Sequence, residues 1–255
     1  MGVQLLDKTR KINGLLNSGS SDKVVFSDMC NVLGNVLLSR VIILSKKGKV
    51  LGYGISPGLE KEKNIISAKV GEFVDGDVNE RLLDILSTKE NVNLETLGFD
   101  REYSEMFNAI VTPINIAGER SGTMFAYRTD KKYNIDDIIL SEYGATVVGL
   151  ELIRSLNQET EEMFRNSNMV SSAIGTLSLS ERDAICKVMK KIRDEETDLI
   201  IASRISQEIG ITRSIIVNAL KKLESAGVIS CKSAGMKGTH IRVINNAIYS
   251  QLGIV

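Results

Sequence analysis

Histidine and cysteine are scarce in this sequence of 255 residues, which has one histidine, three cysteines and no tryptophan. The cysteines lie far apart and form no Cys-x-x-Cys pair, so neither a disulfide framework nor a structural zinc site is expected. A catalytic or metal site based on histidine has only His240 to draw on. The phosphate-binding motifs Gly-x-x-x-x-Gly-Lys-Ser/Thr and Gly-x-Gly-x-x-Gly are also absent. We therefore expect no catalytic residues, no bound metal and no enzymatic activity.

Long apolar runs are missing as well. No stretch approaches the roughly 20 residues that a membrane-spanning helix needs. The apolar residues near the N-terminus are spaced rather than continuous, unlike those of a signal peptide. We expect a cytoplasmic protein of one or two domains that does not associate with membranes.

Charge is unevenly distributed, although acidic and basic residues number 32 each. From Leu199 onward there are seven basic residues and only two acidic ones, a net charge of +5. The preceding part of the chain is correspondingly acidic. A basic terminal module on an acidic body fits local contact with DNA better than adhesion of the whole protein.

The pattern from residue 202 to residue 243 predicts a winged helix-turn-helix. Residues 202–209 and 213–225 have apolar residues at helical spacing, and Gly210-Ile211-Thr212 lies between them. Gly210 can adopt the left-handed conformation that ends a helix, and Thr212 is a suitable N-cap. Residues 228–233 and 239–243 alternate like strands around a glycine-rich turn, which is typical of a wing.

Polar residues of the helix-turn-helix, most of them on its second helix, and of the wing are the candidate DNA ligands. Ordinary helix packing is the alternative explanation of a helix-turn-helix pattern, but the order of turn, polar helix face and wing favours DNA binding. Ser214 is also a candidate phosphorylation site, because a phosphate there would repel the DNA backbone. The candidate DNA-binding residues are Ser203, Thr212, Arg213, Ser214, Asn218, Lys221, Lys222, Lys232 and Lys237.

The N-terminal half predicts an α+β fold. Helices are expected at 3–17 and 27–37, hairpins at 41–55 and 109–127, and further helices at 60–69 and 78–86. Antiparallel hairpins between terminal helices argue against a doubly wound nucleotide-binding fold.

One long helical pattern runs from Ile135 to about Leu177. It is longer than most globular helices, and its seam is too polar for a confident coiled coil. We interpret its second half as a linker helix at a dimer interface. Ser180 and Asp183 resemble a capping box that opens the next helix at Glu181.

Several long motifs resemble the CodY family of global transcriptional regulators along nearly the whole chain. In the second half they are Gly210-Ile211-Thr212-Arg213-Ser214, Asn218-Ala219-Leu220, Lys222 to Ile229 and Gly235-Met236-Lys237-Gly238-Thr239. In the first half they include Gly118-Glu119-Arg120 and Glu142 to Gly149. The resemblance implies a GAF-like effector-binding domain at 1–155, a linker helix at 156–177 and a winged helix-turn-helix DNA-binding domain at 178–255.

The same resemblance implies a homodimeric regulator, mainly a repressor, of A/T-rich palindromic operators. Isoleucine, leucine or valine raises the affinity of family members for DNA, and many members respond to GTP. The other hypothesis is a GAF-type nucleotide-binding interaction protein without sequence-specific DNA binding.

The resemblance also indicates which residues form the effector site, and several of them differ from the family pattern. Lys63 stands where the family has an arginine for the ligand carboxylate, so the charge is kept and the bidentate geometry is lost. Phe73 and Phe99 match aromatic pocket walls, while Leu97 replaces a threonine and Ser67 a methionine. The alternative is that the two phenylalanines are core residues.

Overall fold

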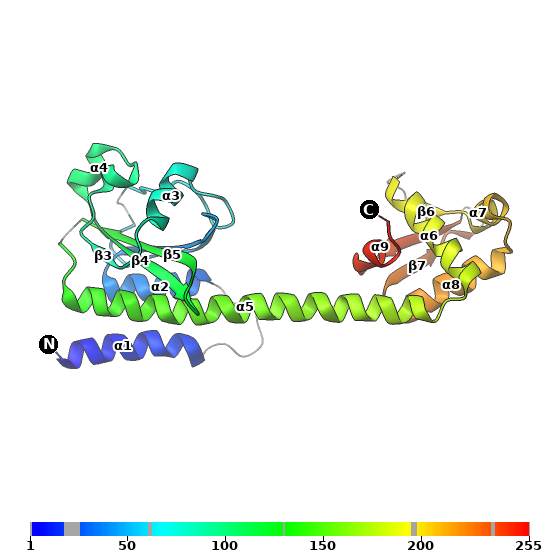
Figure 1. Cartoon of the computed structure of the whole chain (residues 1–255), viewed down its shortest axis with the longest axis horizontal. Coiled ribbons are helices and arrows are strands. Elements are labelled where there is room, and N and C mark those ends of the chain that lie inside the picture. The colour runs from blue at the N-terminus through cyan, green and yellow to red at the C-terminus, as the bar shows by residue number, and fades with distance from the viewer. Residues whose placement is uncertain are drawn as a thin grey trace. The chain divides into compact units, whose positions relative to one another are not determined.

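A five-stranded antiparallel sheet forms the centre of the N-terminal part (Figure 1), and its strand order is β2-β1-β5-β4-β3. The structure is a computed structural model that describes residues 2–17, 26–60, 63–129, 131–194, 198–235 and 238–254. The strands are β1 (Arg40–Ser45), β2 (Val50–Ile55), β3 (Lys89–Glu90), β4 (Asn108–Ile116) and β5 (Glu119–Arg128).

Both faces of this sheet are covered. Along β1, Val41 and Ile43 join the core on one face, whereas Ile42 and Leu44 join the core on the other, because successive side chains of a strand point to opposite sides. One face packs against α1 (Gly2–Asn17), α2 (Phe26–Leu37) and the first part of α5 (Ile135–Gly175). The other face carries α3 (Gly76–Leu83), the 3₁₀ helix η1 (Leu94–Leu97) and α4 (Arg101–Met106) (Figure 1).

Close approach of α2 to β2 depends on glycine. A Cβ atom on Gly54 would lie 2.2 Å from the backbone carbon of Cys30, and one on Gly52 would lie 2.5 Å from the backbone of Phe26. The absence of a side chain therefore lets the helix rest directly on the strand.

The sequence located the two hairpins of this sheet correctly but misjudged the segment between them. Residues 63–69 are not helical, so the helix expected at 60–69 is wrong in the part that the structure describes. Consecutive Ile65 and Ile66 are both buried, which fits an extended segment pressed onto the core. The next helix, α3, begins earlier than expected, because the Asp75 carboxylate accepts hydrogen bonds from the N–H groups of Asp77 and Val78. The short elements β3, η1 and α4 had no clear signal in the sequence.

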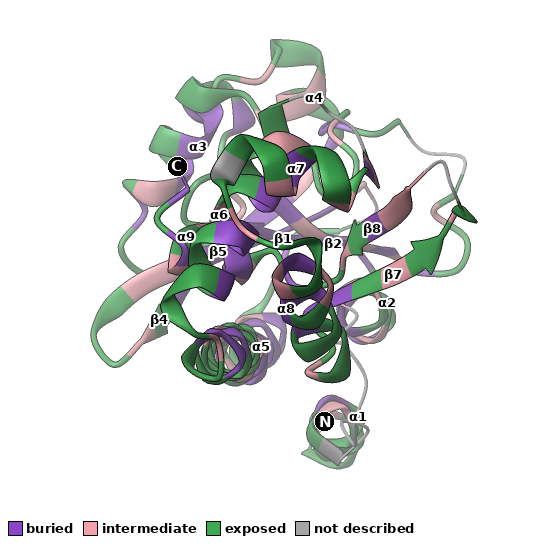
Figure 2. Cartoon of the chain, turned by 90° about the vertical axis from the view of Figure 1, so that its right-hand side faces the viewer, coloured by how far each residue is buried: buried purple, intermediate pink, exposed green. Residues whose placement is uncertain are grey.

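The C-terminal part is a winged helix-turn-helix. Buried and exposed residues both occur on its helices (Figure 2), and the buried ones form a single core around Ile185, Ile216, Leu223 and Ile241. Its helices are α6 (Leu179–Asp194), α7 (Ala202–Ile209), α8 (Arg213–Ser225) and α9 (Ala247–Gln251). Its antiparallel sheet has the order β6-β8-β7, with β6 (Leu199–Ile200), β7 (Ile229–Ser233) and β8 (Thr239–Val243).

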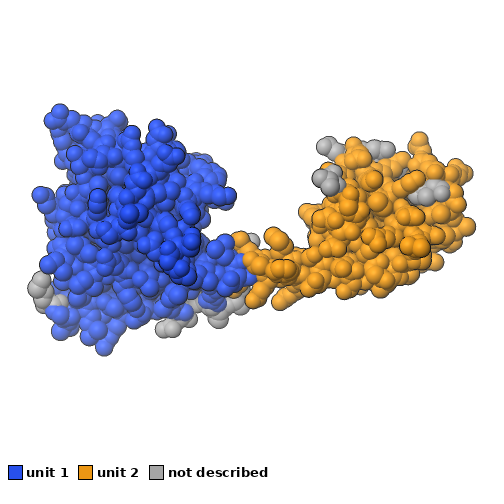
Figure 3. All heavy atoms as spheres, viewed as in Figure 1, with its two compact units in different colours: residues 1–157 blue, residues 158–255 orange. Residues whose placement is uncertain are grey.

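The chain divides into two compact units, residues 1–157 and 158–255 (Figure 3). The division falls inside α5. Val170, Ala173 and Ile174 of this helix belong to the core of the second unit. Asn245 also donates a hydrogen bond to the Asn166 carbonyl at 2.9 Å. The last turns of α5, which the sequence assigned to a separate linker, are thus packed into the winged unit.

Two helix caps differ from the sequence expectation. The capping box of α6 is formed by Ser178 and Glu181, not by Ser180 and Asp183, so the helix begins at Leu179. Thr212 occupies the N-cap position of α8, but its hydroxyl caps no N–H group and instead lies 2.9 Å from the Ser214 hydroxyl. Gly210 has the expected left-handed conformation, with φ of 74°.

Candidate effector pocket and nucleic-acid interface

A cavity of about 260 Å³ opens on the α3 side of the large sheet. Ser67, Phe73 and Phe99 all line it, so the structure brings three of the five candidate effector residues together. Phe73 is 61 % exposed, which contradicts the alternative that it is a core residue. Phe99 is half-buried, and its ring stacks on Phe125 with centroids 6.0 Å apart. The other lining residues are Ile65, Ile66, Ala68, Glu72, Val74, Asp75 and Val78.

Lys63 and Leu97 are placed differently. Leu97 is buried in the core of the unit and does not line the cavity. The Lys63 ammonium also lies outside the cavity lining and contacts the Glu102 carboxylate of α4 at 2.6 Å. The hydrogen bond that Lys63 donates to this carboxylate, together with the negative charge of Glu102, raises the pKa of Lys63. The candidate anchor for a ligand carboxylate is therefore occupied by a carboxylate of the chain itself.

The segment that leads from Lys63 into the pocket is held by a tyrosine that sequence reasoning missed. The Tyr127 hydroxyl donates to the Asn64 side chain at 2.7 Å and accepts from the Ile65 N–H at 3.3 Å. Burial in the core raises the pKa of Tyr127, so this hydroxyl keeps its proton. The only sequence signal was its position in a predicted strand.

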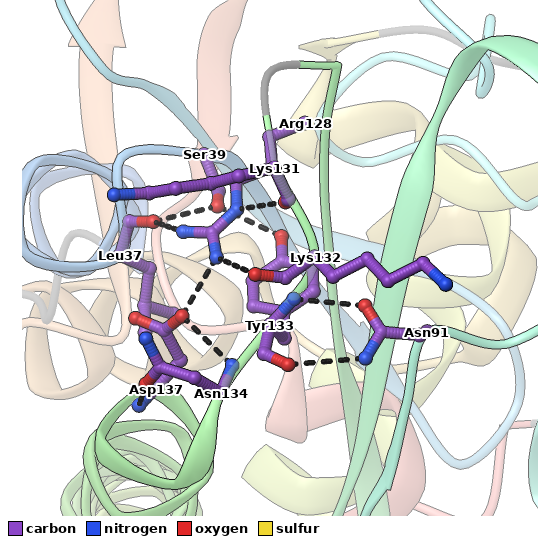
Figure 4. A network of polar contacts seen from close by, with 9 residues as sticks. All are labelled: Leu37, Ser39, Asn91, Arg128, Lys131, Lys132, Tyr133, Asn134 and Asp137. Atoms are coloured by element: carbon purple, nitrogen blue, oxygen red, sulfur yellow. Dashed lines mark hydrogen bonds and ion pairs between the residues drawn. The ribbon is translucent and has the colours of Figure 1, made fainter.

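A buried polar network anchors the start of α5 (Figure 4). The Arg128 guanidinium contacts the Asp137 carboxylate at 2.6 Å and donates to the Leu37 carbonyl at 2.7 Å. It also donates to the carbonyls of Lys131 and Lys132, and it lies 4.1 Å from the centre of the Tyr133 ring. One side chain thus ties together the ends of α2, β5 and the turn before α5.

Asn91 extends this network toward the effector pocket. Its side chain donates to the Tyr133 carbonyl at 3.0 Å and accepts from the Tyr133 N–H at 2.8 Å. Asn91 follows β3 and precedes η1 and Phe99 in the chain. The network therefore joins the segment that leads into a pocket wall to the first turn of α5 (Figure 4).

Candidate DNA ligands lie on the exposed side of α8. Arg213, Ser214, Asn218 and Lys221 are all exposed, whereas Ile216 and other apolar residues of the same helix are buried. This division follows the helical period of 3.6 residues. The face offers hydroxyl, amide and cationic donors that suit phosphates and base edges.

A groove of about 680 Å³ borders this surface on the side of the wing, and it lies between α8, the start of α7 and the strands of the wing. Ser203, Arg213 and Lys221 line it, while Ser214 and Asn218 do not. Lys232 is exposed on β7. Lys237 lies outside the described residues.

Lys222 differs from its neighbours on α8. Its ammonium lies 2.7 Å from the Glu181 carboxylate and 3.2 Å from the Thr176 carbonyl. The sequence placed it among the residues available to phosphates, but in the structure its charge is paired within the unit.

Metal binding, membrane spanning and nucleophilic chemistry have little basis in the part of the chain that the structure describes. Among these residues, no cluster of three or more His, Cys, Asp and Glu side chains is arranged to hold a metal ion. No helix among the described residues has the length and apolarity needed to cross a membrane. Burial raises the pKa of the Cys30 thiol to about 12 and that of Cys231 to about 11, so neither is poised as a nucleophile.

Comparison with known proteins covers almost the whole chain. Residues 4–176 match the model of the CodY GAF-like domain, and residues 195–254 match that of the CodY helix-turn-helix domain. The chain is 44 % identical to the global transcriptional regulator CodY of Thermoanaerobacter sp. (strain X514) and 45 % identical to that of Clostridium acetobutylicum, with 97 % of each chain covered. It is also 34 % identical to a solved structure described as the cofactor-binding GAF domain of the nutrient sensor CodY from Clostridium difficile. That match covers 58 % of this chain and 96 % of the other, with a TM-score of 0.44.

Proposed function

The chain belongs to the CodY family of global transcriptional regulators, and from this we propose that it binds A/T-rich palindromic operators as an effector-dependent repressor. The observation that carries the proposal is the exposed face of α8, where Arg213, Ser214, Asn218 and Lys221 lie beside a wing. Two such helices in a homodimer would enter successive major grooves of a palindrome. Exposed apolar residues of α5, including Met163 and Phe164, support pairing with a second copy.

Substitution of Arg213 tests the DNA-binding role. Arg213→Glu should abolish binding to the palindrome that the unaltered chain selects from a random DNA pool, because it places an acid against the phosphates. Arg182→Glu is the matched control, since Arg182 is exposed on α6 outside the helix-turn-helix. Gel-shift binding by the Arg213 variant equal to that of the control would refute the assignment.

Ser214 is the proposed point of modification. Its hydroxyl is exposed at the start of α8. A phosphate there would meet the DNA backbone and lower affinity through repulsion. Ser214→Glu should weaken operator binding, and normal binding by this variant would remove the proposal.

Branched-chain amino acids are the proposed effectors of the first unit. The cavity pairs the aromatic walls Phe73 and Phe99 with polar groups, as small-molecule sites do. We propose that the Lys63 ammonium releases the Glu102 carboxylate and binds the ligand carboxylate in its place, since either carboxylate can accept the same charge-assisted hydrogen bond. To raise DNA affinity, the ligand must bind the DNA-competent state more tightly than the other state.

Calorimetric titration with isoleucine tests this site. We expect one isoleucine per chain, weaker binding in Lys63→Ala and tighter binding in Glu102→Gln, which removes the competing negative charge. Lys47→Ala is the control for loss of an exposed lysine in the same unit. Isoleucine binding unchanged in Lys63→Ala would reject the anchor, and leucine, valine and GTP titrated in parallel would test the wider proposed effector range.

A further inference from the structure

Three elements of the winged unit meet at Lys222. This residue lies in the last turn of α8, and its ammonium contacts both the Glu181 carboxylate of α6 and the Thr176 carbonyl after α5. The Glu181 side chain is only 10 % exposed and that of Lys222 is 42 % exposed. The pair is therefore shielded more than a typical surface ion pair and is less weakened by salt.

Glu181 is held in place independently of Lys222. The same carboxylate oxygen accepts a hydrogen bond from the Ser178 N–H at 2.8 Å, and the Glu181 N–H donates to the Ser178 hydroxyl at 3.3 Å. This reciprocal capping box fixes the side chain to the first turn of α6. The Glu181 carboxylate is thus already fixed in position to accept the ion pair from Lys222 at the end of α8.

A second contact holds the same turn of α8 on its other side. Glu224 accepts a hydrogen bond from the Cys231 N–H of β7 at 2.8 Å, and Leu223, which lies between Lys222 and Glu224, is fully buried. Residues two apart on a helix point in widely different directions. Lys222 and Glu224 therefore attach α8 to α6 on one side and to β7 on the other, which limits rotation of the helix about its axis.

We propose that Lys222 is a positioning residue of the recognition helix, anchored by Glu181, and not a ligand of DNA phosphate. The inference rests on the proposed function that α8 binds DNA. Rotation of α8 by even part of a turn would redirect Asn218 and Arg213, which lie on its exposed side. Attachment to Thr176 also joins the recognition helix to the end of α5.

Neutral substitutions separate the two roles. Lys222→Met keeps most of the side-chain length and removes the charge, and Glu181→Gln removes the opposing charge while retaining a residue that capping boxes accept. Lys221→Met is the matched control, because Lys221 is exposed on the same helix and has no ion pair among the described residues. Lys222→Arg keeps the ion pair and serves as the rescue variant.

The assay is fluorescence anisotropy with a labelled duplex carrying the palindrome that the unaltered chain selects, at several salt concentrations. Circular dichroism confirms that each variant is folded. We expect Lys222→Met and Glu181→Gln each to raise Kd by on the order of fivefold, with the salt dependence unchanged and with near-normal binding in Lys222→Arg. Lys221→Met should instead reduce the slope of log K against log salt by about 0.9, as expected for loss of one phosphate contact.

Two results would overturn the inference. A reduced salt slope in Lys222→Met with normal binding by Glu181→Gln would make Lys222 a phosphate ligand. Unchanged Kd in both variants would mean that the ion pair contributes to folding alone. Failure of the unaltered chain to select any duplex would refute the proposed function itself, a result distinct from both.

Discussion

Removing the charge of Arg128 should destabilise the N-terminal unit strongly. The side chains of Arg128 and Asp137 are only 2 % and 7 % exposed, and their charged atoms are 2.6 Å apart. Arg128→Met would leave the Asp137 carboxylate buried without a counter-charge and would deprive three backbone carbonyls of their donor. Breaking such a buried pair from one side typically costs about 3–5 kcal/mol. For a unit of this size that corresponds to a fall in Tm of roughly 6–20 °C.

Differential scanning calorimetry of the full chain measures this effect. The two units can unfold in separate transitions, so the shift should appear in the transition of the N-terminal unit. Arg101→Met is the matched control, because Arg101 and Glu105 also form an ion pair, at 2.9 Å, but their side chains are 79 % and 68 % exposed. An exposed pair of this kind contributes about 0–1 kcal/mol.

A double substitution tests whether the two charges act as a pair. Arg128→Met with Asp137→Asn should cost less than the sum of the single changes, since neither charge is then left buried alone. Equal shifts for Arg128→Met and the Arg101 control, or strict additivity of the two buried changes, would refute the reasoning from burial.

Two further predictions concern packing and pH. Gly54→Ala should lower the free energy of unfolding by about 1–3 kcal/mol, because the new methyl group would overlap the Cys30 backbone. Gly14→Ala, at a position of α1 with open space around it, should instead raise the free energy of unfolding by about 0.5–1 kcal/mol. Chemical denaturation compares the two variants, and equal effects would contradict the close approach of α2 to β2. The Lys222 ammonium and the capping hydrogen bond lower the pKa of Glu181. The ionised Glu181 carboxylate therefore contributes its full stabilisation above the ordinary glutamate pKa of about 4.3, and this stabilisation is lost as the pH falls through the lowered pKa of the folded state. Thermal unfolding between pH 6 and pH 3 should show the advantage over Glu181→Gln shrinking only below that point, and a constant difference across the range would reject it.

The sequence alone determined the strongly periodic elements. Two β-rich apolar runs around a glycine-containing turn were enough to locate each hairpin, in 41–55 and in 109–127, because strands buried on both faces read as short, nearly continuous apolar segments. Gly210 and the apolar stripe through Ile216 and Leu223 likewise specified the helix-turn-helix, since a left-handed turn and a 3.6-residue period are local requirements. Long motifs then led to the family.

Tertiary structure decided what depends on contacts between distant residues. Residues 63–69 have polar and apolar residues in a mixture that does not exclude a helix, yet packing of Ile65 and Ile66 and the Tyr127 hydroxyl hold them extended. Neither the pairing of Lys63 with Glu102 nor that of Lys222 with Glu181 could be predicted, because 39 and 41 residues separate the partners along the chain. Local pattern reveals which residues are charged and which face of a helix they occupy. Only the folded chain determines which opposite charge comes within reach, and for Lys222 that contact separates a positioning residue from a free phosphate ligand.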